Sequence, residues 1–390
     1  MSKALFINGN VHGHINPTLP LVSELVKRGE EIHYFSTMEF KQKIEATGAK
    51  FIDYGQSLYN FLNNYRPSGN HPFYTLIEFV LKMDEVAVNL VLEKIGSLQY
   101  DYVIHDSMLG GGSFIAKKLN LPAICSCTSF AMNKLPMPPN KLERGSHPQL
   151  DNYLDEADRM SNDLNIEMPS IMNVFFKKEP LNIVFTSRLF QPQADSFDNS
   201  YKFIGPSIAD RKEDVDFEMD QLKNKKVLYI SMGTINNNLI EFYRKCIDAF
   251  KDKEFTVIMS VGNKLDIGAI GEFPGNFIIK NYVPQLEVLK RTDLFISHGG
   301  LNSVSEALYY GVPIISIPQA NDQHMVTRQL IDIGAGIGLK MDEITPEVLY
   351  DTANKMLKDN SYKDACEKVR LSFIEAGGYK SGADYIMGRT

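Results

Sequence analysis

Short runs of apolar residues alternate with helical patterns along the chain. An apolar run of about five residues predicts a buried strand, and apolar residues spaced about 3.6 positions apart predict a helix with one buried face. In the first half, we expect strands at 4–7, 32–36, 50–52, 102–105 and 123–127, and helices at 17–28, 40–47, 73–95 and 112–120. This alternation is typical of a parallel sheet covered by helices.

The alternation begins again at Val227. Here we expect strands at 227–231, 255–260, 277–279, 294–297 and 312–317, and helices at 239–250 and 302–310. Residues 210–226, between the halves, are rich in charge and poor in aliphatic side chains, as linkers are. At about 150 residues per domain, a chain of 390 residues holds two or three domains, and the restart favours two. We therefore expect an α/β protein with two doubly wound domains, at 1–209 and 227–377.

Composition narrows the class of protein. Hydrophobic residues make up 44% and charged residues 23%, as in globular proteins. The net charge of −7 disfavours nucleic acid as a partner. Four cysteines without a CxxC pair exclude a disulfide scaffold and favour a reducing cytoplasm. No apolar stretch approaches the roughly 18 residues of a membrane span, and no signal peptide is recognisable, so we expect a cytoplasmic protein.

Candidate chemistry is concentrated in loops that follow strands, where open α/β sheets bind their ligands. With two such domains facing each other, we expect the site in the cleft between them. The first loop, 8–17, lacks GxGxxG, which disfavours a nicotinamide dinucleotide, and it contains His12 and His14. Asn16 as N-cap and Pro17 as first helical residue predict a helix start directly after them. Since a helix N-terminus disfavours imidazolium, a neutral His14 is a candidate general base. The alternative is that both histidines only shape a glycine-rich turn.

The second loop contains Asp106, at the carboxyl end of another predicted strand. A carboxylate there could orient a histidine and stabilise the imidazolium that forms when the histidine takes a proton. The alternative is that Asp106 caps the following helix.

The third loop, 297–306 (SHGGLNSVSE), has the highest density of functional groups. Its glycines and the helix start behind them suit a phosphate, with His298 and Ser303 as further donors. Glu306 lies one turn further on, where it could bind a ribose diol. The loop 231–234 (SMGT) is a second candidate for phosphate contact, although a plain turn explains it equally well.

Two further motifs carry less weight. The run 334–338 (GAGIG) follows a helix rather than a strand, so we interpret it as a helix stop and turn. The DxD spacing at 214–216 lies in the charged linker, where we expect solvated side chains. The sequence therefore offers no convincing metal site.

These motifs resemble those of a known family. Residues 282–285 (YVPQ), 298–303 (HGGLNS), 306–307, 311–313 and 318–323 resemble the donor-binding signature of UDP-glycosyltransferases. Residues 12–17 (HGHINP) resemble the N-terminal catalytic loop of the same family, in its bacterial macrolide glycosyltransferase-like branch. The similarity extends over nearly the whole chain, including 182–185 and 203–206.

The resemblance implies a GT-B fold, in which two Rossmann-like domains face each other and the C-terminal domain holds most of the donor. It also implies a final helix, 378–390, that crosses back to the N-terminal domain. In this family His14 would be the base that deprotonates the acceptor, and Asp106 would orient it. The resemblance further implies that Val283 and Gln285 meet the uracil, that Glu306 binds the ribose, that His298, Gly300, Asn302, Ser303 and Thr234 surround the diphosphate, and that Asp322 and Gln323 contact the transferred sugar.

The implied reaction is a single displacement that inverts the anomeric carbon of an α-linked UDP-hexose, most simply UDP-glucose. The helix near Asn302, with His298, would stabilise the departing UDP, so neither metal nor cofactor is expected and the UDP-sugar is a co-substrate. The acceptor pocket should lie in the first half, where 58–79 and 130–176 read as irregular and are rich in Phe, Tyr and Met. The residues in question are Phe61, Tyr65, Phe73, Tyr74, Phe130, Met132, Met137, Met160, Met168 and Met172.

Because methionine adapts to varied apolar shapes, this composition suggests a lipophilic, hydroxylated acceptor such as a macrolide, flavonoid or triterpenoid. Ordinary core packing is the alternative explanation of these side chains. A sugar-nucleotide epimerase of the same fold remains a competing function, as does a non-catalytic sugar-nucleotide binder. Neither of these would need His14 and Asp106 as a pair. A dinucleotide oxidoreductase is weakened by the missing fingerprint.

Overall fold

The chain forms two compact units. The computed structural model describes residues 2–133, 142–168, 171, 177–209, 217–233, 239–320 and 322–388. The first unit comprises Met1–Phe185, Gln193–Ser207 and Gly377–Thr390, and the second comprises Thr186–Pro192 and Ile208–Ala376. The segment Thr186–Pro192, which sequence analysis places in the first domain, groups with the second unit, where the ring of Phe190 contacts Phe373 edge-on at 5.9 Å.

The first unit contains a parallel sheet. Its described residues form seven strands in the order β3-β2-β1-β4-β5-β6-β7. The strands are β1 (Lys3–Ile7), β2 (Glu31–Ser36), β3 (Lys50–Asp53), β4 (Tyr102–Asp106), β5 (Ala123–Cys127), β6 (Leu181–Val184) and β7 (Tyr201–Phe203). The helices are α1 (His12–Ile15), α2 (Thr18–Lys27), α3 (Lys41–Glu45), α4 (Gln56–Asn64), α5 (Pro72–Ile95), α6 (Gly112–Leu119), α7 (Pro148–Leu164) and α14 (Gly378–Ile386).

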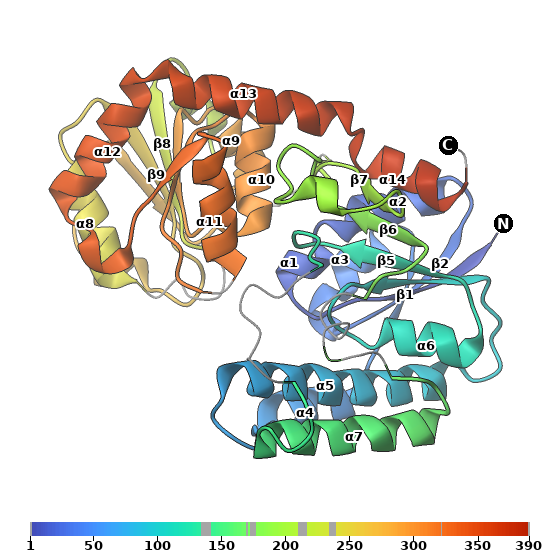
Figure 1. Cartoon of the computed structure of the whole chain (residues 1–390). Helices are drawn as coiled ribbons and strands as arrows, with labels where there is room; N and C mark the ends of the chain where they lie inside the picture. The colour runs from blue at the N-terminus through green and yellow to red at the C-terminus, as the bar shows by residue number, and fades with distance from the viewer. Residues whose placement is uncertain are drawn as a thin grey trace. The chain divides into compact units, whose positions relative to one another are not determined.

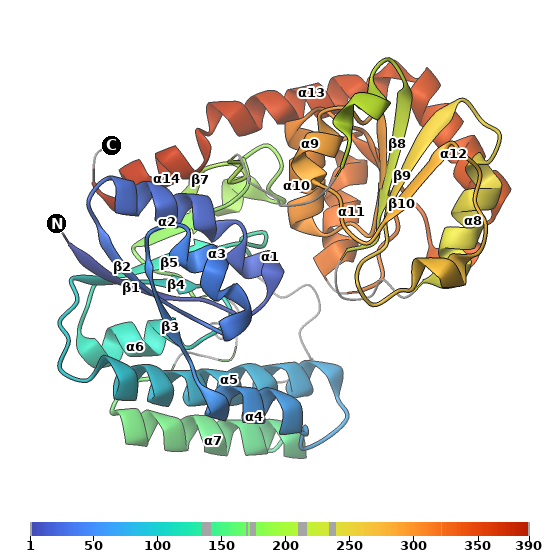
Figure 2. The same cartoon turned by 180° about the vertical axis from the view of Figure 1, so that it is seen from behind.

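Helices cover both faces of this sheet. Strand β1 alternates its side chains between the faces, so that Leu5 and Ile7 join one buried cluster and Ala4 and Phe6 join another. The first cluster includes α5, α6 and α7, and the second includes α2, α3 and α14. Figures 1 and 2 show these two layers, with α4 and α7 packed outside α5. Burial on both faces explains why the strands read as continuous apolar runs.

The end of the chain packs on the first unit. Helix α14 lies against α2, and the backbone N–H of Gly378 donates to the carbonyl of Ile204 at 2.7 Å. Arg28, just after α2, forms an ion pair with Asp384 of α14 and another with Glu24 at 2.7 Å. These contacts hold α14 beside α2, on the same face of the sheet (Figure 1).

The second unit contains another parallel sheet. Its described residues form six strands in the order β10-β9-β8-β11-β12-β13. The strands are β8 (Lys226–Ser231), β9 (Phe255–Ser260), β10 (Phe277–Lys280), β11 (Leu294–Ser297), β12 (Ile314–Ser316) and β13 (Gly336–Gly338). The helices are α8 (Ile240–Phe250), α9 (Gln285–Leu289), α10 (Leu301–Tyr309), α11 (Asp322–Asp332), α12 (Pro346–Lys358) and α13 (Asn360–Glu375). On one face α8 and α12 pack on Leu228 and Ile230, while α10 packs with α9, α11 and α13.

The ten strands expected from the sequence are confirmed, but three local predictions are wrong. Residues Gly336–Gly338, predicted as a turn, form β13 beside β12. A Cβ atom at Gly336 would lie 2.3 Å from the carbonyl oxygen of Ile314, so the glycine permits close pairing of the strands. Segments 58–79 and 130–176, predicted as irregular, contain α4 and α7. The start of α5 at Pro72 agrees with the helix expected at 73–95.

The third correction concerns the first loop. Helix α2 begins at Thr18, after Pro17, and Asn16 is helical rather than an extended N-cap. His14 therefore lies within the four-residue helix α1 instead of ahead of a longer helix. The N-terminus of a longer helix therefore does not keep His14 neutral.

Among the described helices, none combines the length and the apolar character that crossing a membrane requires.

Candidate active site

Buried hydrogen bonds fix the backbone of α1. Asn8, directly after β1, is fully buried, and its Nδ2 donates to the carbonyl of His14 at 3.0 Å and to the hydroxyl of Tyr34 at 2.6 Å. Thr18 joins this cluster, because its Oγ1 donates to the carbonyl of Ile15 at 2.8 Å. Sequence analysis did not single out Asn8, although a polar residue directly after a buried strand is a usable signal. The cluster anchors the turn that presents His14.

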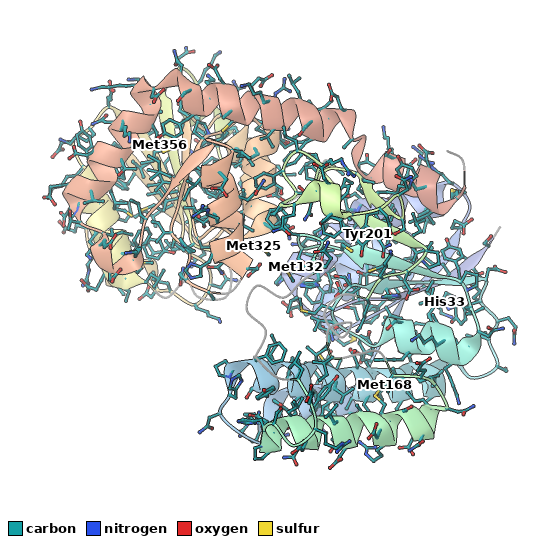
Figure 3. The ribbon with its side chains drawn as sticks, in the orientation of Figure 1. His33, Met132, Met168, Tyr201, Met325 and Met356 are labelled. Atoms are coloured by element: carbon teal, nitrogen blue, oxygen red, sulfur yellow. The ribbon has the colours of Figure 1, made fainter. Side chains whose placement is uncertain are left out.

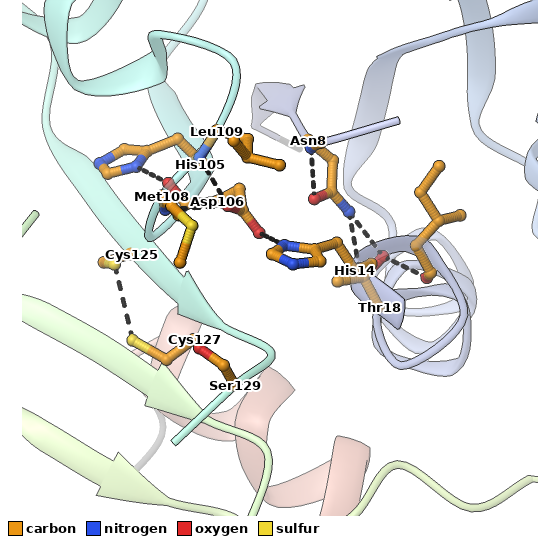
Figure 4. A network of polar contacts seen from close by, with 12 residues as sticks. Asn8, His14, Thr18, His105, Asp106, Met108, Leu109, Cys125, Cys127 and Ser129 are labelled. Carbon is orange, nitrogen blue, oxygen red and sulfur yellow. Dashed lines mark hydrogen bonds and ion pairs between the residues drawn. The ribbon is translucent and has the colours of Figure 1, made fainter. Parts of the chain in front are cut away.

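His14 and Asp106 meet at the carboxyl edge of the sheet, as Figure 4 shows. His14 Nδ1 lies 2.6 Å from Asp106 Oδ2, and Asp106 is the last residue of β4. The His14 side chain keeps 18% of its surface exposed, whereas that of Asp106 is fully buried. Neighbouring parallel strands, β1 and β4, bring the two loops together.

Asp106 is held as a carboxylate. Burial alone would raise its pKa, but the charge of His14, the hydrogen bond to it and two backbone amides together lower the pKa. Those amides belong to Met108 and Leu109, which donate to Asp106 Oδ1 at 2.9 and 2.8 Å. The alternative role as a helix cap is wrong, because α6 is preceded by Gly111 and has no side-chain cap.

This arrangement defines what His14 can do. A carboxylate accepts hydrogen bonds and cannot donate them, so Nδ1 of His14 carries the proton that faces Asp106. In the neutral ring, Nε2 then has a lone pair that can accept a proton. The pair therefore has the chemistry of an oriented general base.

His12 differs from His14 in that its carboxylate partner is exposed rather than buried. Its Nε2 lies 2.9 Å from Glu39 Oε1, and its ring stands edge-on to Phe40 at 4.9 Å. The side chains of His12 and Glu39 are 39% and 63% exposed. His12 is thus a surface residue, which makes it a natural control for His14.

In the second unit, the structure brings two of the predicted donor residues into contact. Gln285, the first residue of α9, donates from Nε2 to Glu306 Oε2 of α10 at 2.6 Å. Tyr229 of β8 donates its hydroxyl to Gln285 Oε1 at 2.9 Å. Glu306 is 5% exposed, and the bond from Gln285 compensates part of the cost of burying a carboxylate. Sequence analysis missed Tyr229, since nothing in an apolar strand marks a tyrosine as functional.

The glycine-rich loop between β11 and α10 has a geometry that only glycine allows. Gly299 has φ +82, and a Cβ atom there would lie 2.5 Å from Ser316 Oγ. Gly300 is the N-cap of α10 and makes no side-chain cap bond, while Asn302 and Ser303 lie in the first turn. Backbone N–H groups at such a helix start can bind an anion.

His298 lies beside this loop. Burial lowers its pKa to about 4, although a backbone hydrogen bond with Ser231 opposes the shift. Within the described part of the chain, its Nδ1 is buried and has no hydrogen-bond partner. Carbon and nitrogen atoms of the ring would lie under 3 Å from a Cβ atom at Gly233 or Gly300, so both glycines make room for the imidazole.

The remaining predicted donor residues are less closely grouped. Asp322 and Gln323 begin α11, and Gln323 Oε1 accepts from the backbone N–H groups of Gln319 and Ala320 at 2.8 and 3.2 Å. Val283 is buried, with 5% of the whole residue exposed. Thr234 lies outside the described residues, as does the DxD run at 214–216.

The aromatic and methionine residues of the first unit divide into two groups. Tyr74 and Met160 are buried in the core, and the rings of Phe61 and Phe79 stack with their centroids 5.9 Å apart. These residues therefore agree with ordinary core packing rather than with an acceptor pocket. Met137 and Met172 lie outside the described residues.

Phe130 and Met132, in contrast, line a small cavity with Ser107, Met108, Cys127, Ser129, Ala131, Lys177 and Tyr201. Figure 3 labels Met132 and Tyr201. Two of the lining residues, Ser107 and Met108, belong to the loop that directly follows Asp106.

Lys177 and Asp84 form a buried ion pair near this cavity. Lys177 Nζ donates to Asp84 Oδ2 at 2.7 Å and to the carbonyl of Met108 at 3.0 Å, and the two side chains are 2% and 1% exposed. The pair ties α5 to the loop that follows Asp106.

All four cysteines are free and buried. In the described ranges, no group of three or more His, Cys, Asp or Glu side chains could hold a metal ion.

Sequence comparisons identify the relatives of this chain. The family profile of the erythromycin biosynthesis protein CIII-like C-terminal domain matches residues 245–375. The uncharacterized UDP-glucosyltransferase YojK of Bacillus subtilis is 36% identical over 394 residues, covering 99% of this chain and 97% of YojK. The NDP-glycosyltransferase YjiC of Bacillus subtilis is 33% identical over 395 residues, covering 97% and 95% of the two chains.

Solved structures support the same fold. The calicheamicin glycosyltransferase CalG4 matches with a TM-score of 0.86 at 24% identity, covering 100% of this chain and 98% of CalG4. The glycosyltransferase VinC, solved with dTDP, matches with a TM-score of 0.73 at 16% identity, covering 99% and 98%. The two parallel sheets are therefore those of a GT-B glycosyltransferase. With relatives above 30% identity along nearly its whole length, this chain belongs to the bacterial UDP/NDP-glycosyltransferase family, whose enzymes transfer a sugar from a nucleotide donor.

Proposed function

We propose that this enzyme transfers a hexose, most simply glucose, from a UDP-sugar to a hydroxyl group of a lipophilic small molecule, with His14 as general base. The observation that carries the proposal is the 2.6 Å contact between His14 Nδ1 and the fully buried carboxylate of Asp106. A structural histidine on a glycine-rich turn does not need a buried carboxylate to set its tautomer.

The proposed step is a single displacement. The acceptor hydroxyl gives its proton to Nε2 of His14 as its oxygen forms a bond to the anomeric carbon. The bond from that carbon to the phosphate oxygen breaks, and its electron pair leaves with UDP. Attack from the face opposite the diphosphate turns an α-linked donor into a β-glycoside. Asp106 stabilises the imidazolium that forms.

The second unit supplies the donor site in this proposal. The start of α10 suits a diphosphate, because Gly300 leaves the first backbone N–H groups without a side-chain cap among the described residues. His298 and the first-turn residues Asn302 and Ser303 lie beside it. The developing charge on UDP is then met by oriented dipoles rather than by a metal. VinC, a structural neighbour, was solved with the nucleoside diphosphate dTDP, which supports a site of this kind.

The nucleoside and the sugar complete the proposed donor site. Glu306 would accept hydrogen bonds from the ribose hydroxyls, and Val283 and Gln285 would contact the uracil. Asp322 and Gln323, at the start of α11, would contact hydroxyl groups of the transferred sugar. The backbone bonds to Gln323 Oε1 fix its side-chain amide.

The first unit supplies the acceptor site. We place the acceptor beside the small cavity lined by Phe130 and Met132, which also includes Ser107 and Met108 of the loop after Asp106. Relatives over most of the chain include the oleandomycin glycosyltransferase of Streptomyces antibioticus, at 27% identity. We therefore propose acceptors with a large apolar surface and at least one free hydroxyl, of the macrolide, flavonoid or triterpenoid type.

The test is incubation of the protein with UDP-glucose and a panel of such aglycones, in a chelating buffer without added metal. Mass spectrometry should detect an aglycone with one added hexose. His12→Ala is the matched control and should retain transfer, because His12 is exposed and pairs with Glu39. An epimerised UDP-sugar with no adduct would favour an epimerase. Nucleotide binding without any turnover would favour a non-catalytic binder.

A further inference from the structure

Tyr229 is a polar residue in the middle of an apolar strand. It lies in β8, is 1% exposed, and its ring stacks on Phe295 of β11 with centroids 4.8 Å apart and planes 9° apart. A buried tyrosine hydroxyl needs a hydrogen-bond partner, and here the partner is Gln285 Oε1 at 2.9 Å. The alternation of β8 places Tyr229 opposite Leu228 and Ile230, which face α8 and α12.

Gln285 continues the contact from Tyr229 to Glu306. Its Oε1 accepts from the tyrosine, and its Nε2 donates to Glu306 Oε2 at 2.6 Å. An amide rotated by 180° would turn its oxygen toward the carboxylate, and two acceptors would then face each other. Glu306 therefore selects the orientation of the amide, and Tyr229 donates to the amide oxygen in that orientation. The three side chains link β8, α9 and α10.

We infer that Tyr229 is a positioning residue of the donor site, which holds the Glu306 carboxylate in place through Gln285. The inference rests on the proposed role of Glu306 as the ribose ligand. An ionised carboxylate has about four acceptor positions, and the hydrogen bond from Gln285 to Oε2 uses one of them. A carboxylate with a fixed position favours a ribose with both hydroxyls over a 2′-deoxyribose. We therefore expect Tyr229 to favour binding of UDP over dTDP.

Tyr229→Phe removes one hydroxyl and keeps the ring and its stacking. The matched control is Tyr243→Phe in α8 of the same unit, where the hydroxyl is buried and has no hydrogen-bond partner among the described residues. By calorimetric titration, Tyr229→Phe should bind UDP about five- to tenfold more weakly, the effect of one lost hydrogen bond. Its affinity for dTDP should fall less, so the ratio of the two affinities should shrink. The control should bind both nucleotides as the parent protein does.

Kinetics give an independent readout of positioning. With saturating acceptor, Tyr229→Phe should raise KM for UDP-glucose and leave kcat within about twofold, because binding of donor and transition state weakens alike. In a Gln285→Ala background, Tyr229→Phe should have no further effect on UDP affinity, since the link to Glu306 is already broken.

The inference is overturned if Tyr229→Phe binds both nucleotides like the parent, or loses both affinities equally so that their ratio is unchanged. Failure of the proposed function gives a different result, because the parent protein would then form no aglycone–hexose adduct, even if it binds UDP. Thermal melts of both tyrosine variants, recorded without nucleotide, identify any loss of folded protein.

Discussion

The Asp106 carboxylate accepts three hydrogen bonds, and an asparagine amide in its place should preserve two of them. Oδ1 receives the N–H groups of Met108 and Leu109, and Oδ2 faces His14 Nδ1 (Figure 4). In Asp106→Asn, the amide oxygen keeps the two backbone donors, so its NH₂ group faces the imidazole. Nδ1 must then accept, the ring proton moves to Nε2, and the nitrogen that should take the acceptor proton is blocked.

The size of the effect follows from this exchange of tautomer. General base catalysis contributes about 10²- to 10⁴-fold, so Asp106→Asn should lower kcat by that factor, or about 3–5 kcal/mol in the activation barrier. Stability should change much less, because no buried backbone N–H loses its partner and the variant no longer buries a charge. Asp106→Ala, in contrast, leaves two amides unpaired, at about 1–3 kcal/mol each.

The assay measures kcat for glucosyl transfer and urea unfolding on the same preparations of the parent and both variants. The pKa of Asp106 is lowered in the fold, so its contribution to stability is present above about pH 4 and is lost on further acidification. Asp106→Asn should lack this part of the pH dependence. A variant that is folded at pH 7 and turns over within threefold of the parent would refute the reasoning about the tautomer.

Two further predictions concern stability. Lys177→Met should lower the free energy of unfolding by about 3–5 kcal/mol, because it leaves the carboxylate of Asp84 buried without its cation. Combining it with Asp84→Asn should recover most of the loss. Urea unfolding of the single and double variants checks this, and equal losses in both would contradict it. Acidification from pH 7 to pH 4 should cost up to about 3 kcal/mol through His298, because the unfolded chain takes up a proton near pH 6.5 that the folded residue resists until about pH 4. His298→Gln should remove that share of the pH dependence, and an unchanged profile in the variant would show that another group carries it.

The strands and the two-fold repetition of the α/β pattern were predictable because buried parallel strands are apolar on both faces. The ten expected strands begin or end within about two residues of the observed ones. Strand β13 was missed because Gly336–Gly338 has almost no apolar side chain, and its pairing depends on the absence of a Cβ atom beside Ile314. Helices α4 and α7 were missed because they have polar outer faces and lie near loop residues, so the 3.6-residue spacing of their apolar positions was not recognised.

The candidate site shows a similar limit. His14 and Asp106 were predictable as a pair, because each follows a strand and the strands are neighbours in the sheet. Their local setting was not predictable, since the Asn8 side chain that holds α1 is itself held by Tyr34, 26 residues further along the chain. Tyr229 and Lys177 were invisible for the same reason, because each is defined by partners more than fifty residues away.

The most direct test of the central claim compares His14→Ala with His12→Ala, using UDP-glucose and one accepted aglycone. For His14→Ala we predict that kcat falls about 10²- to 10⁴-fold, while calorimetry gives a Kd for UDP within about twofold of the parent value. His12→Ala should retain both properties. Normal turnover by His14→Ala, at any pH at which the parent is active, would contradict the assignment of His14 as the general base.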